Sequence, residues 1–539
     1  MAIRDDKMGQ SWLLPLSVTD LIRVGHICYL VIAIVNSIDV SEIENKYRCK
    51  PGNPAYPRRM LLRLLVQAAI DGVWSSRKID NLAHENVVYM YLAGNEKPDF
   101  RTLCKFRSEN KELIEAIFKE TVTFAKALGI LSLGHLSSDG TKTKASASND
   151  NTLNKAEIEA IREIIEHGIA VDEEEDKLYG DKRGDELPPE LNTQQKIREK
   201  LKEIEQASGR KLKSVVAKII EQHTLGDENQ KEQIIEKLDK AEEELNKSGQ
   251  SAVSITDPEA RFMKNKKGRI ELSYNPQITV DHDSGIIVAN DVTQDCTDHA
   301  QLEPQVNSTL ENVGELPEDA KMSFDNGYFS GANLQYLETN GLDGYIPDSK
   351  QAQEMKGNKP KMSPFSKDSF YYDEETDQFL CPGGEILSRK GEYEYNGKPM
   401  YAYYGANCAE CPFGSECAGE GKMKVITSDG YEGERRRMAA KMRSEAGKEA
   451  YKMRKETVEW PFGNIKQNMK FREFMTRGIE KVKIEYNLVC TAHNLKVIWG
   501  KLERNVSIIG MIRALIANSA SKVGNFLRLH PIFNFKCQC

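Results

Sequence analysis

The sequence lacks a hydrophobic segment long enough to cross a membrane. Its best candidate, Ile27 to Val35 (ICYLVIAIV), is about half of the roughly 20 residues that a spanning helix needs. The N-terminus carries Arg4, Asp5, Asp6 and Lys7 without a small-residue cleavage site, so we expect no signal peptide. These absences exclude a membrane partner and predict a cytoplasmic protein in which Ile27 to Val35 is a buried helix.

Cysteine is also scarce, with 11 residues in 539, which excludes a disulfide scaffold. In a reducing compartment these thiols are expected to be free or metal-bound. No internal repeat is visible. The length predicts two to four domains.

The net charge of −7 seems to exclude a nucleic-acid partner, but its distribution does not. Residues 151–250 hold 17 Lys and Arg against 25 Asp and Glu, whereas residues 431–510 hold 18 against 10. Only the local charge matters to a phosphate backbone. The basic block therefore suits DNA binding, although a solvated helical surface explains it equally well.

The first 130 residues are rich in apolar positions at helical spacing, such as PRRMLLRLLVQAAIDGV (58–74). Short helices with polar turns suit either a DNA-binding helix-turn-helix region or a plain helical bundle. Residues 151–250 are charged and heptad-like, which predicts a helical or coiled-coil insertion, partly disordered near VDEEEDKLYGDKRGDELPPE. This insertion pairs two subunits or forms a solvated arm.

Two predicted strands end on an aspartate. The segment GHLSSDGT (134–141) ends near Asp139, and Met322 to Phe324 runs into Asp325. Residues 269–294 read as two strands around an Asp-Ser-Gly turn. With the insertion removed, the order is three strands, helix, strand, helix, strand and a late helix.

That order predicts an α/β RNase H-like core, a mixed sheet flanked by helices, with an all-α N-terminal region, a helical insertion and a small Cys-rich loop domain. The predicted segments are 1–130 (helical, DNA-binding), 131–150 and 251–350 (RNase H-like core), 151–250 (insertion), 375–425 (Cys-rich loop), 430–505 (basic helices completing the core) and 506–539 (tail).

The late helix RKETVEWPFGNIKQNMKFREF offers a further acid, Glu459, with Glu456 as an alternative. Glu459 and Lys466 are seven residues apart, two helical turns, and are expected to project from one face. An acid that can hold a metal, beside cations that can hold phosphate, suits phosphoryl transfer on DNA. The other nearby cations are Arg454, Lys455, Lys470 and Arg472.

Four blocks carry a family resemblance: SSDGTKTKASAS, SYNPQITVD, SFDNGYFSGANLQYL and TVEWPFGNIKQNMKFREFMTRGIEKVKIEYNLVCTAHNLKVI. In motif, order and spacing, over residues 40 to 500, they resemble the blocks of bacterial insertion-sequence DDE transposases. The resemblance implies that the catalytic, metal-binding acids are Asp139, Asp325 and Glu459. It also implies phosphate contacts by Lys466 and the neighbouring basic residues. One departure is that Tyr451 and Arg454 lie one residue too early relative to Glu459, which leaves Lys455 at the position of the family's arginine.

The resemblance implies a DNA transposase that uses two Mg²⁺ or Mn²⁺ ions per site, because clustered carboxylates repel one another and prefer hard cations. Water would cut the element end, and the freed 3′-OH would attack target DNA. The implied partners are double-stranded DNA, as terminal inverted repeats and target, and further copies of the chain. The protein would be bacterial and associated with the nucleoid when bound to DNA.

Four thiols gather between the second aspartate and Glu459: Cys381, Cys408, Cys411 and Cys417. They suit a structural, tetrahedral zinc site that supplies stability to a short loop domain. Free thiols in a loosely packed loop are the alternative.

Other polar residues near these motifs have ordinary explanations as well as functional ones. Tyr274, Asn275 and Gln277 on the second strand orient an acid, contact DNA or serve strand packing. Asp298 and His299 open a helix, and an N-cap explains that pair best. Trp460 is expected to make a core contact, with stacking on an unpaired base as the alternative.

Two rival functions remain open on the sequence alone. One is a catalytically inactive or repurposed DNA-binding protein derived from a transposase. The other is an RNase H-like nuclease that cuts DNA without joining it.

Overall fold

The structure is a computed structural model of the 539-residue chain. It describes residues 17–23, 25–45, 54–159, 161–162, 202, 206, 228–265, 267–355, 357–358, 363–419 and 422–504. The tail predicted for 506–539 and most of the charged insertion lie outside the described residues. No helix in the described ranges combines the length and apolar character that crossing a membrane requires.

The described helices are α1 (Cys28–Ser37), α2 (Ser41–Asn45), α3 (Arg58–Ile70), α4 (Ser76–Glu85), α5 (Val87–Leu92), α6 (Phe100–Glu109), α7 (Lys111–Ala127), α11 (Glu228–Ser248), α12 (Leu302–Val313), α13 (Gly331–Thr339), α14 (Ser349–Met355), α15 (Gly414–Ala418), α16 (Glu432–Arg443), α17 (Glu445–Gly463) and α18 (Ile479–Arg504). Short helical turns are η1 (Val18–Leu21), η2 (Asn326–Tyr328), η3 (Lys367–Ser369) and η4 (Asn464–Asn468).

The strands are β1 (His135–Gly140), β2 (Thr143–Lys144), β3 (Thr152–Leu153), β4 (Val253–Ser254), β5 (Arg261–Lys264), β6 (Ile270–Asp281), β7 (Ile287–Thr293), β8 (Lys321–Ser323), β9 (Asp343–Tyr345), β10 (Tyr371–Asp373), β11 (Gln378–Leu380), β12 (Ile386–Tyr395), β13 (Lys398–Gly405) and β14 (Val425–Ser428).

A mixed seven-stranded sheet forms the centre of the molecule. Its order is β2-β6-β1-β8-β9, and β5 and β7 also pair with β6. Strand β1 is antiparallel to β6 and parallel to β8, and β8 is parallel to β9. Because β7 is antiparallel to β6, it runs in the same direction as β1. The carboxyl ends of β1, β7 and β8 therefore lie at one edge of the sheet.

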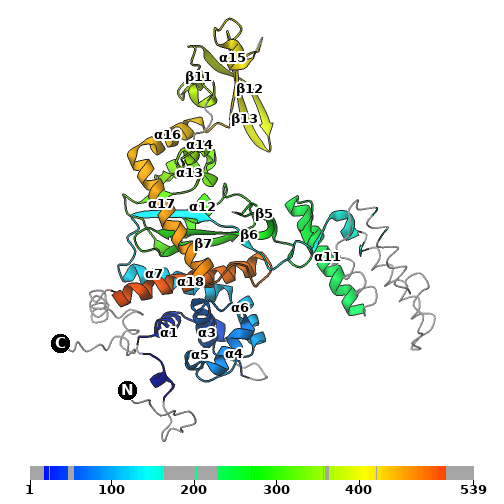
Figure 1. Ribbon diagram of the computed structural model, residues 1–539, viewed down its shortest axis with the longest axis vertical. Helices are drawn as coiled ribbons and strands as arrows, with labels where there is room; N and C mark the ends of the chain where they lie inside the picture. Colours follow the sequence, from blue (N-terminus) through cyan, green and yellow to red (C-terminus); the bar gives the residue numbers. More distant parts are fainter. Residues whose placement is uncertain are drawn as a thin grey trace, which may run out of the picture.

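Helices cover this sheet from elements far apart in the sequence. Helix α17 crosses it and packs on β1, β6, β8 and β9, while α12 and α18 pack on β7. Figure 1 shows the helical layer of α1 to α7 below the sheet, with α18 between them, and α11 projecting to one side. One hydrophobic core runs through the helical layer and the sheet. Among the described residues up to Ile130, the regular elements are all helical.

The Cys-rich segment is a folded sheet, which corrects the prediction of a loop domain. Strands β10 to β14 form a five-stranded antiparallel sheet at one end of the molecule (Figure 1). The β12–β13 hairpin turns at Asn396 and Gly397, both with positive φ (52° and 74°). Asn-Gly between two runs of alternating residues is a strong hairpin signal and accounts for this turn. The sheet has a small hydrophobic core of its own, formed by Phe370, Phe379, Leu387, Tyr403 and Ile426.

The basic segment predicted as helices for residues 430–505 is interrupted by a π-helical turn and a non-helical stretch. Helix α17 ends at Gly463, and the next turn, η4, is a π-helix. The chain then runs without a helix to α18, burying Phe471 and Phe474. Pro461 carries no amide hydrogen and so removes one helical donor just before this change. The simple two-turn spacing expected between Glu459 and Lys466 therefore does not hold.

Candidate active site

Asp139 and Asp325 lie at the carboxyl ends of two adjacent parallel strands. Ser137 of β1 is opposite Ser323 of β8, and each aspartate is two residues further along its own strand direction. The two carboxylates therefore reach the same level at the edge of the sheet. Asp325 also accepts a hydrogen bond from the backbone N–H of Gly327 and so caps the turn η2.

Arg454 of α17 lies between these two aspartates. Its Nη2 is 3.0 Å from Asp139 Oδ2 and 3.6 Å from Asp325 Oδ2. The side chain is buried, with only 7% of the residue exposed. Burial lowers the pKa of Arg454, but the charges of Asp139 and Asp325 raise it, and the net shift is upward. The guanidinium therefore stays charged and offsets the repulsion between the two carboxylates.

This position differs from the role that the sequence suggested for Arg454. We expected it to contact DNA phosphates, but in the structure it binds the two acids from inside the protein. Lys455, its neighbour, is exposed. Arg454 lies on the side of α17 that packs on the sheet, whereas Lys455 lies on the side that faces solvent.

Glu459 and Glu456 are both solvent-exposed on α17. The buried side of the helix consists instead of Arg454, Thr457, Val458 and Pro461. At 100° per residue, Glu459 lies about 140° around the helix axis from Arg454. The structure thus brings Asp139 and Asp325 together and leaves both glutamates on the outer surface of the helix that crosses them.

A third carboxylate at this edge, Asp298, was not predicted as a site residue. It lies in the loop between β7 and α12. Helix α12 begins at Leu302 and its N-cap residue is Gln301, so Asp298 is not the N-cap that the sequence suggested. Its Oδ1 accepts hydrogen bonds from Asn275 Nδ2 and Gln277 Nε2, each at 2.7 Å. The strand order predicts that Asp298 lies near the other acids, because β7 ends at the same edge of the sheet as β1 and β8.

The strand β6 supplies the polar wall behind Asp298. Asn275 and Gln277 are fully buried, and the hydroxyl of Tyr328 donates to Gln277 Oε1. Burial raises the pKa of Tyr328 well above its ordinary value, and the charges of Asp298, Asp139 and Asp325 add to this. Tyr328 therefore remains a hydrogen-bond donor. Tyr274 lies outside this wall and donates to Asp257 at 2.8 Å.

The predicted metal site can be compared with this arrangement. Carboxylates are suitable donors for Mg²⁺ or Mn²⁺. However, Arg454 lies between Asp139 and Asp325, and Glu459 is exposed. Across the described ranges, no three His, Cys, Asp or Glu side chains are arranged to hold a metal ion. The acids as arranged here do not fit a metal ion.

A basic groove of about 600 Å³ begins next to Asp139. Gly140 and Thr141 line it, and Lys466 Nζ donates to Thr141 Oγ1 at 2.5 Å. One acid, Glu271, also lines the groove. Its cationic lining residues are Lys142, Lys144, Lys264, Lys267, Arg269, Lys466 and Arg472.

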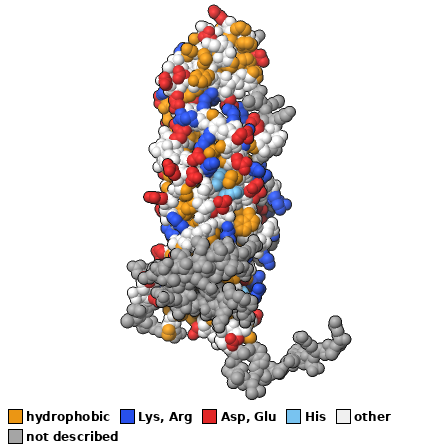
Figure 2. Space-filling model, turned by 90° about the vertical axis from the view of Figure 1, so that its left-hand side faces the viewer, with side chains coloured by type: hydrophobic (Ala, Val, Ile, Leu, Met, Phe, Trp, Pro, Cys, Tyr) orange, Lys and Arg blue, Asp and Glu red, His pale blue; other side chains and the backbone are white. Residues whose placement is uncertain are grey.

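The groove contains two of the five predicted DNA-binding residues, Lys466 and Arg472. Lys470 is exposed nearby in the chain. Five of the groove's cations were not predicted, although the basic run MKNKKGRIEL carries three of them. Figure 2 shows a different face, where basic and acidic side chains are interspersed without a patch of one sign.

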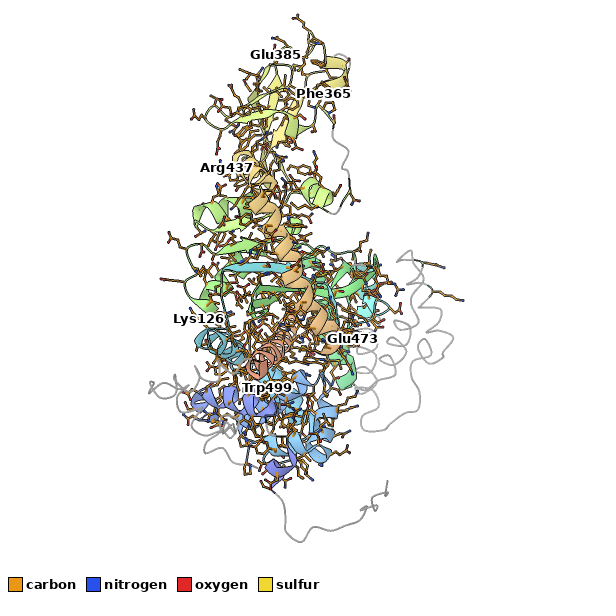
Figure 3. All side chains as sticks on the ribbon, turned by 60° about the vertical axis from the view of Figure 1, so that its left-hand side comes forward. Lys126, Phe365, Glu385, Arg437, Glu473 and Trp499 are labelled. Atoms are coloured by element: carbon orange, nitrogen blue, oxygen red, sulfur yellow. The ribbon has the colours of Figure 1, made fainter. Side chains whose placement is uncertain are left out.

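The four predicted zinc ligands lie at one end of the five-stranded sheet. A Cβ on Gly383 would lie 3.5 Å from Cys411 Sγ and 3.6 Å from Cys381 Sγ. Two sulfurs accept backbone N–H groups: Cys381 from Glu385 at 3.2 Å and Cys408 from Lys424 at 3.4 Å. Figure 3 shows Glu385 at this end of the molecule, far from Glu473, which follows α17 in the chain. Burial raises the pKa of the Cys417 thiol, and the other three thiols contribute in the same direction.

Two protein-family models match the chain. One, described as a transposase DDE domain, matches residues 380–499, and the other, transposase domain (DUF772), matches residues 16–109. The resemblance to insertion-sequence DDE transposases is confirmed. No curated protein matches the sequence.

The transposase matches bear on both fold and function. The DDE domain implies an RNase H-like core, and the mixed sheet flanked by helices agrees with it. A transposase acts on DNA, and its DDE domain belongs to the polynucleotidyl-transferase type of enzyme, which typically uses divalent metals. The DDE match includes Arg454 and Glu459, whereas Asp139, Asp298 and Asp325 precede it.

Proposed function

We propose that the protein is a DNA transposase that cuts the ends of a mobile element and joins the freed 3′-OH to target DNA. The observation that carries this proposal is the pair of carboxylates at the ends of β1 and β8, beside a groove lined by seven cations. Acids at one edge of an RNase H-like sheet suit phosphoryl transfer, and the groove suits a phosphate backbone.

The residues have separate roles in this proposal. Asp139 and Asp325 are the catalytic acids, and Glu459, on the helix that crosses them, is proposed as a further acid from the family resemblance. Lys466 and Arg472 hold the DNA backbone, with Lys455 and Lys470 on the adjoining exposed surface. Mg²⁺ or Mn²⁺ is proposed as the cofactor from the family resemblance alone, because the two acids with Arg454 between them do not fit a metal ion in this structure. Assembly of two or more copies on DNA would bring both element ends together.

The test is an assay with the purified protein and duplex DNA that carries the sequences flanking its coding sequence. Cleavage at a fixed position that requires Mg²⁺ or Mn²⁺, followed by joined products with a target plasmid, is the expected result. Cutting that never leads to joining would favour the RNase H-like nuclease. Binding without cutting under any metal would favour the inactive DNA-binding protein.

The groove predicts a charge-dependent loss of DNA affinity. Replacing Lys267 and Arg269 with glutamine removes two exposed cations from the β5–β6 hairpin. The slope of log affinity against log salt is expected to fall by about 2, because each phosphate contact contributes about 0.9. Fluorescence anisotropy over a salt series measures this slope.

A matched control removes two exposed cations elsewhere. Lys237 and Lys240 on α11 lie outside the groove, so their replacement with glutamine should leave the slope unchanged. Equal losses in the two double variants would show that the groove has no special part in DNA binding.

We also propose that the four clustered cysteines bind a structural zinc ion. The five-stranded sheet has a small core, and a metal would add the stability that such a core lacks. Backbone N–H groups already point at two of the sulfurs, as they do toward thiolate ligands. Binding would draw the sulfurs to about 2.3 Å from the ion.

Elemental analysis of the purified protein should then find about one zinc per chain. The variant carrying Cys408→Ser and Cys411→Ser should lose this zinc and become sensitive to proteolysis within residues 371–428. Cys104→Ser, which removes an exposed free cysteine from α6, is the control and should keep the metal. Zinc-free wild type with full protease resistance would contradict the proposal.

A further inference from the structure

Residues 469–478, between η4 and α18, form a strap that carries cations but is neither a helix nor a strand. Its exposed cations are Lys470, Arg472 and Arg477. Arg472 lines the basic groove, and Arg477 lines an adjoining cavity of about 430 Å³. The groove and this cavity share Lys144 as a lining residue. The strap therefore runs along both cavities and brings positive charge to each.

Two buried aromatic side chains fix the strap to the core. Phe471 and Phe474 are each 1% exposed, and their ring centroids are 5.2 Å apart. The ring of Phe471 also packs edge-on against Trp74, with 4.9 Å between the centroids. Arg472, which follows Phe471, is exposed. Burial of the rings thus leaves the cation between them on the outer side of the strap.

The N-terminal helical region holds the start of the strap by its backbone. Trp74 Nε1 donates a hydrogen bond of 2.8 Å to the carbonyl oxygen of Met469, which is 395 residues away in sequence. A Cβ on Gly72 would lie 2.8 Å from the same oxygen. Lys470, the next residue, has a positive φ of 56°, which a residue other than glycine adopts where its surroundings hold it. The loop between α3 and α4 therefore sets the course of the strap.

The rest of the strap is held with equal care. The carboxylate of Glu485, which is fully buried, accepts from the backbone N–H of Met475 at 3.1 Å and of Thr476 at 3.0 Å. It also accepts from the hydroxyl of Thr476 at 2.7 Å. The backbone N–H of Phe474 donates to the carbonyl of Lys144 at 2.9 Å. A buried carboxylate needs such partners, and here loop backbone supplies them.

We propose that Gly72 and Trp74, in the α3–α4 loop, position the strap so that its cations meet DNA phosphates. This inference rests on the proposed function. Cations on a loop that is already ordered lose less conformational freedom when they bind, and the affinity rises accordingly. Gly72 and Trp74 are positioning residues, because they act through the strap. The region that matches the DUF772 transposase domain, residues 16–109, thereby contributes to DNA binding through a contact within the protein.

Gly72→Ala is the decisive variant, because its methyl group would meet the carbonyl of Met469 and displace the strap. Gly94→Ala is the matched control. Gly94 belongs to the same helical region and also has a positive φ (61° against 70° for Gly72), but a Cβ there meets nothing within 4 Å. Both variants carry the same kind of backbone strain, so a difference between them reports the contact with the strap.

Trp74→Phe is a milder second variant. It removes the N–H that donates to Met469 and keeps an aromatic ring near Phe471. Its effects are expected in the same direction as those of Gly72→Ala but smaller. It decides the question if Gly72→Ala does not fold, which thermal unfolding of all three variants shows.

Two readouts go beyond stability. Hydrogen exchange of the DNA-free protein should be faster in residues 469–478 of Gly72→Ala than in wild type and Gly94→Ala. Fluorescence anisotropy should show about tenfold weaker DNA binding by Gly72→Ala at about 0.1 M salt, with a slope of log affinity against log salt that is lower by about 1. The reason is that one phosphate contact, that of Arg472, contributes about 0.9 to the slope. Gly94→Ala should keep the wild-type slope.

The outcomes separate this inference from the proposed function. Wild-type DNA affinity in folded Gly72→Ala and Trp74→Phe would overturn the inference, whether or not the strap exchanges faster. Equal losses of affinity in Gly72→Ala and Gly94→Ala would also overturn it, because backbone strain alone would then be the cause. Wild-type protein that binds DNA but never cuts it would overturn the proposed function and leave the inference, which depends on binding, intact.

Discussion

Asp325→Asn is expected to reduce metal-dependent cleavage of element-end DNA about 1,000-fold, with little change in DNA affinity. A 1,000-fold loss corresponds to about 4 kcal/mol of transition-state stabilisation, which is the expected cost of removing the charge of a catalytic carboxylate. Asparagine can still accept the hydrogen bond from the backbone of Gly327, and it caps helical turns as well as aspartate does. The local fold at η2 should therefore survive, and the groove that contains Lys466 is unchanged.

Single-turnover cleavage and fluorescence anisotropy on the same DNA measure these two effects separately. Asp319→Asn is the control, because it removes an exposed carboxylate shortly before β8 without touching the site. Equal cleavage by wild type and Asp325→Asn would show that the edge of the sheet is not the catalytic centre. Loss of DNA binding in step with cleavage would show instead that Asp325 supports the groove.

Arg454→Met is expected to destabilise the core in metal-free buffer and to make it more responsive to divalent cations. Removing one partner of a buried ion pair takes away part of the charge compensation of its carboxylates and is strongly destabilising. The expected loss is about 3 kcal/mol, at the low end for such pairs, because the side chain of Asp325 is 34% exposed. Since methionine leaves Asp139 and Asp325 facing each other without the guanidinium, Mn²⁺ should bind there more readily.

Thermal unfolding in EDTA and in MnCl₂ tests both parts of this expectation. The Mn²⁺-induced rise in unfolding temperature should be larger for Arg454→Met than for wild type. Lys455→Met, which changes the adjacent exposed cation, should behave like wild type. An equal metal response in all three proteins would mean that Arg454 does not compete with a cation. An unchanged stability in EDTA would mean that the ion pair contributes little to the fold.

The sequence by itself determined much of the core. The strand that carries Asp139, the β6–β7 hairpin, the strand before Asp325 and the helices α12 and α13 all lie where local patterns place them. The hairpin is a clear case: buried Asp281, two residues before the Asp-Ser-Gly sequence, accepts from the backbone N–H of Ser284, and Gly285 adopts the positive φ (73°) that the turn requires. Periodicity and turn residues are local properties, and these elements needed no more.

Two local patterns in the sequence indicate features that the predictions above do not contain: an Asn-Gly turn and a basic turn. Asn396-Gly397 marks the tight turn of the β12–β13 hairpin, and without it the Cys-rich segment was predicted as a loop. The basic turn MKNKKGRIEL lies on the groove beside Asp139, but its distance along the chain from Lys466 hid the connection. Both patterns are local. However, the basic turn is near Asp139 only because β6, which follows it, pairs with β1.

Only the tertiary structure decided the composition of the site. Arg454 reaches Asp139 across more than 300 residues of sequence, and Asp298 comes close to Gly140 and Gly327 through a loop whose local chemistry suggested a helix cap. Such contacts follow from the direction of β7 relative to β1 and from the rotation of α17 about its axis, neither of which is a local property. Propensity and periodicity fix which residues become strands and helices, whereas the neighbours of a side chain are set by packing between elements. For this reason the two aspartates were found from the sequence, and the arginine between them and the third carboxylate beside them were not.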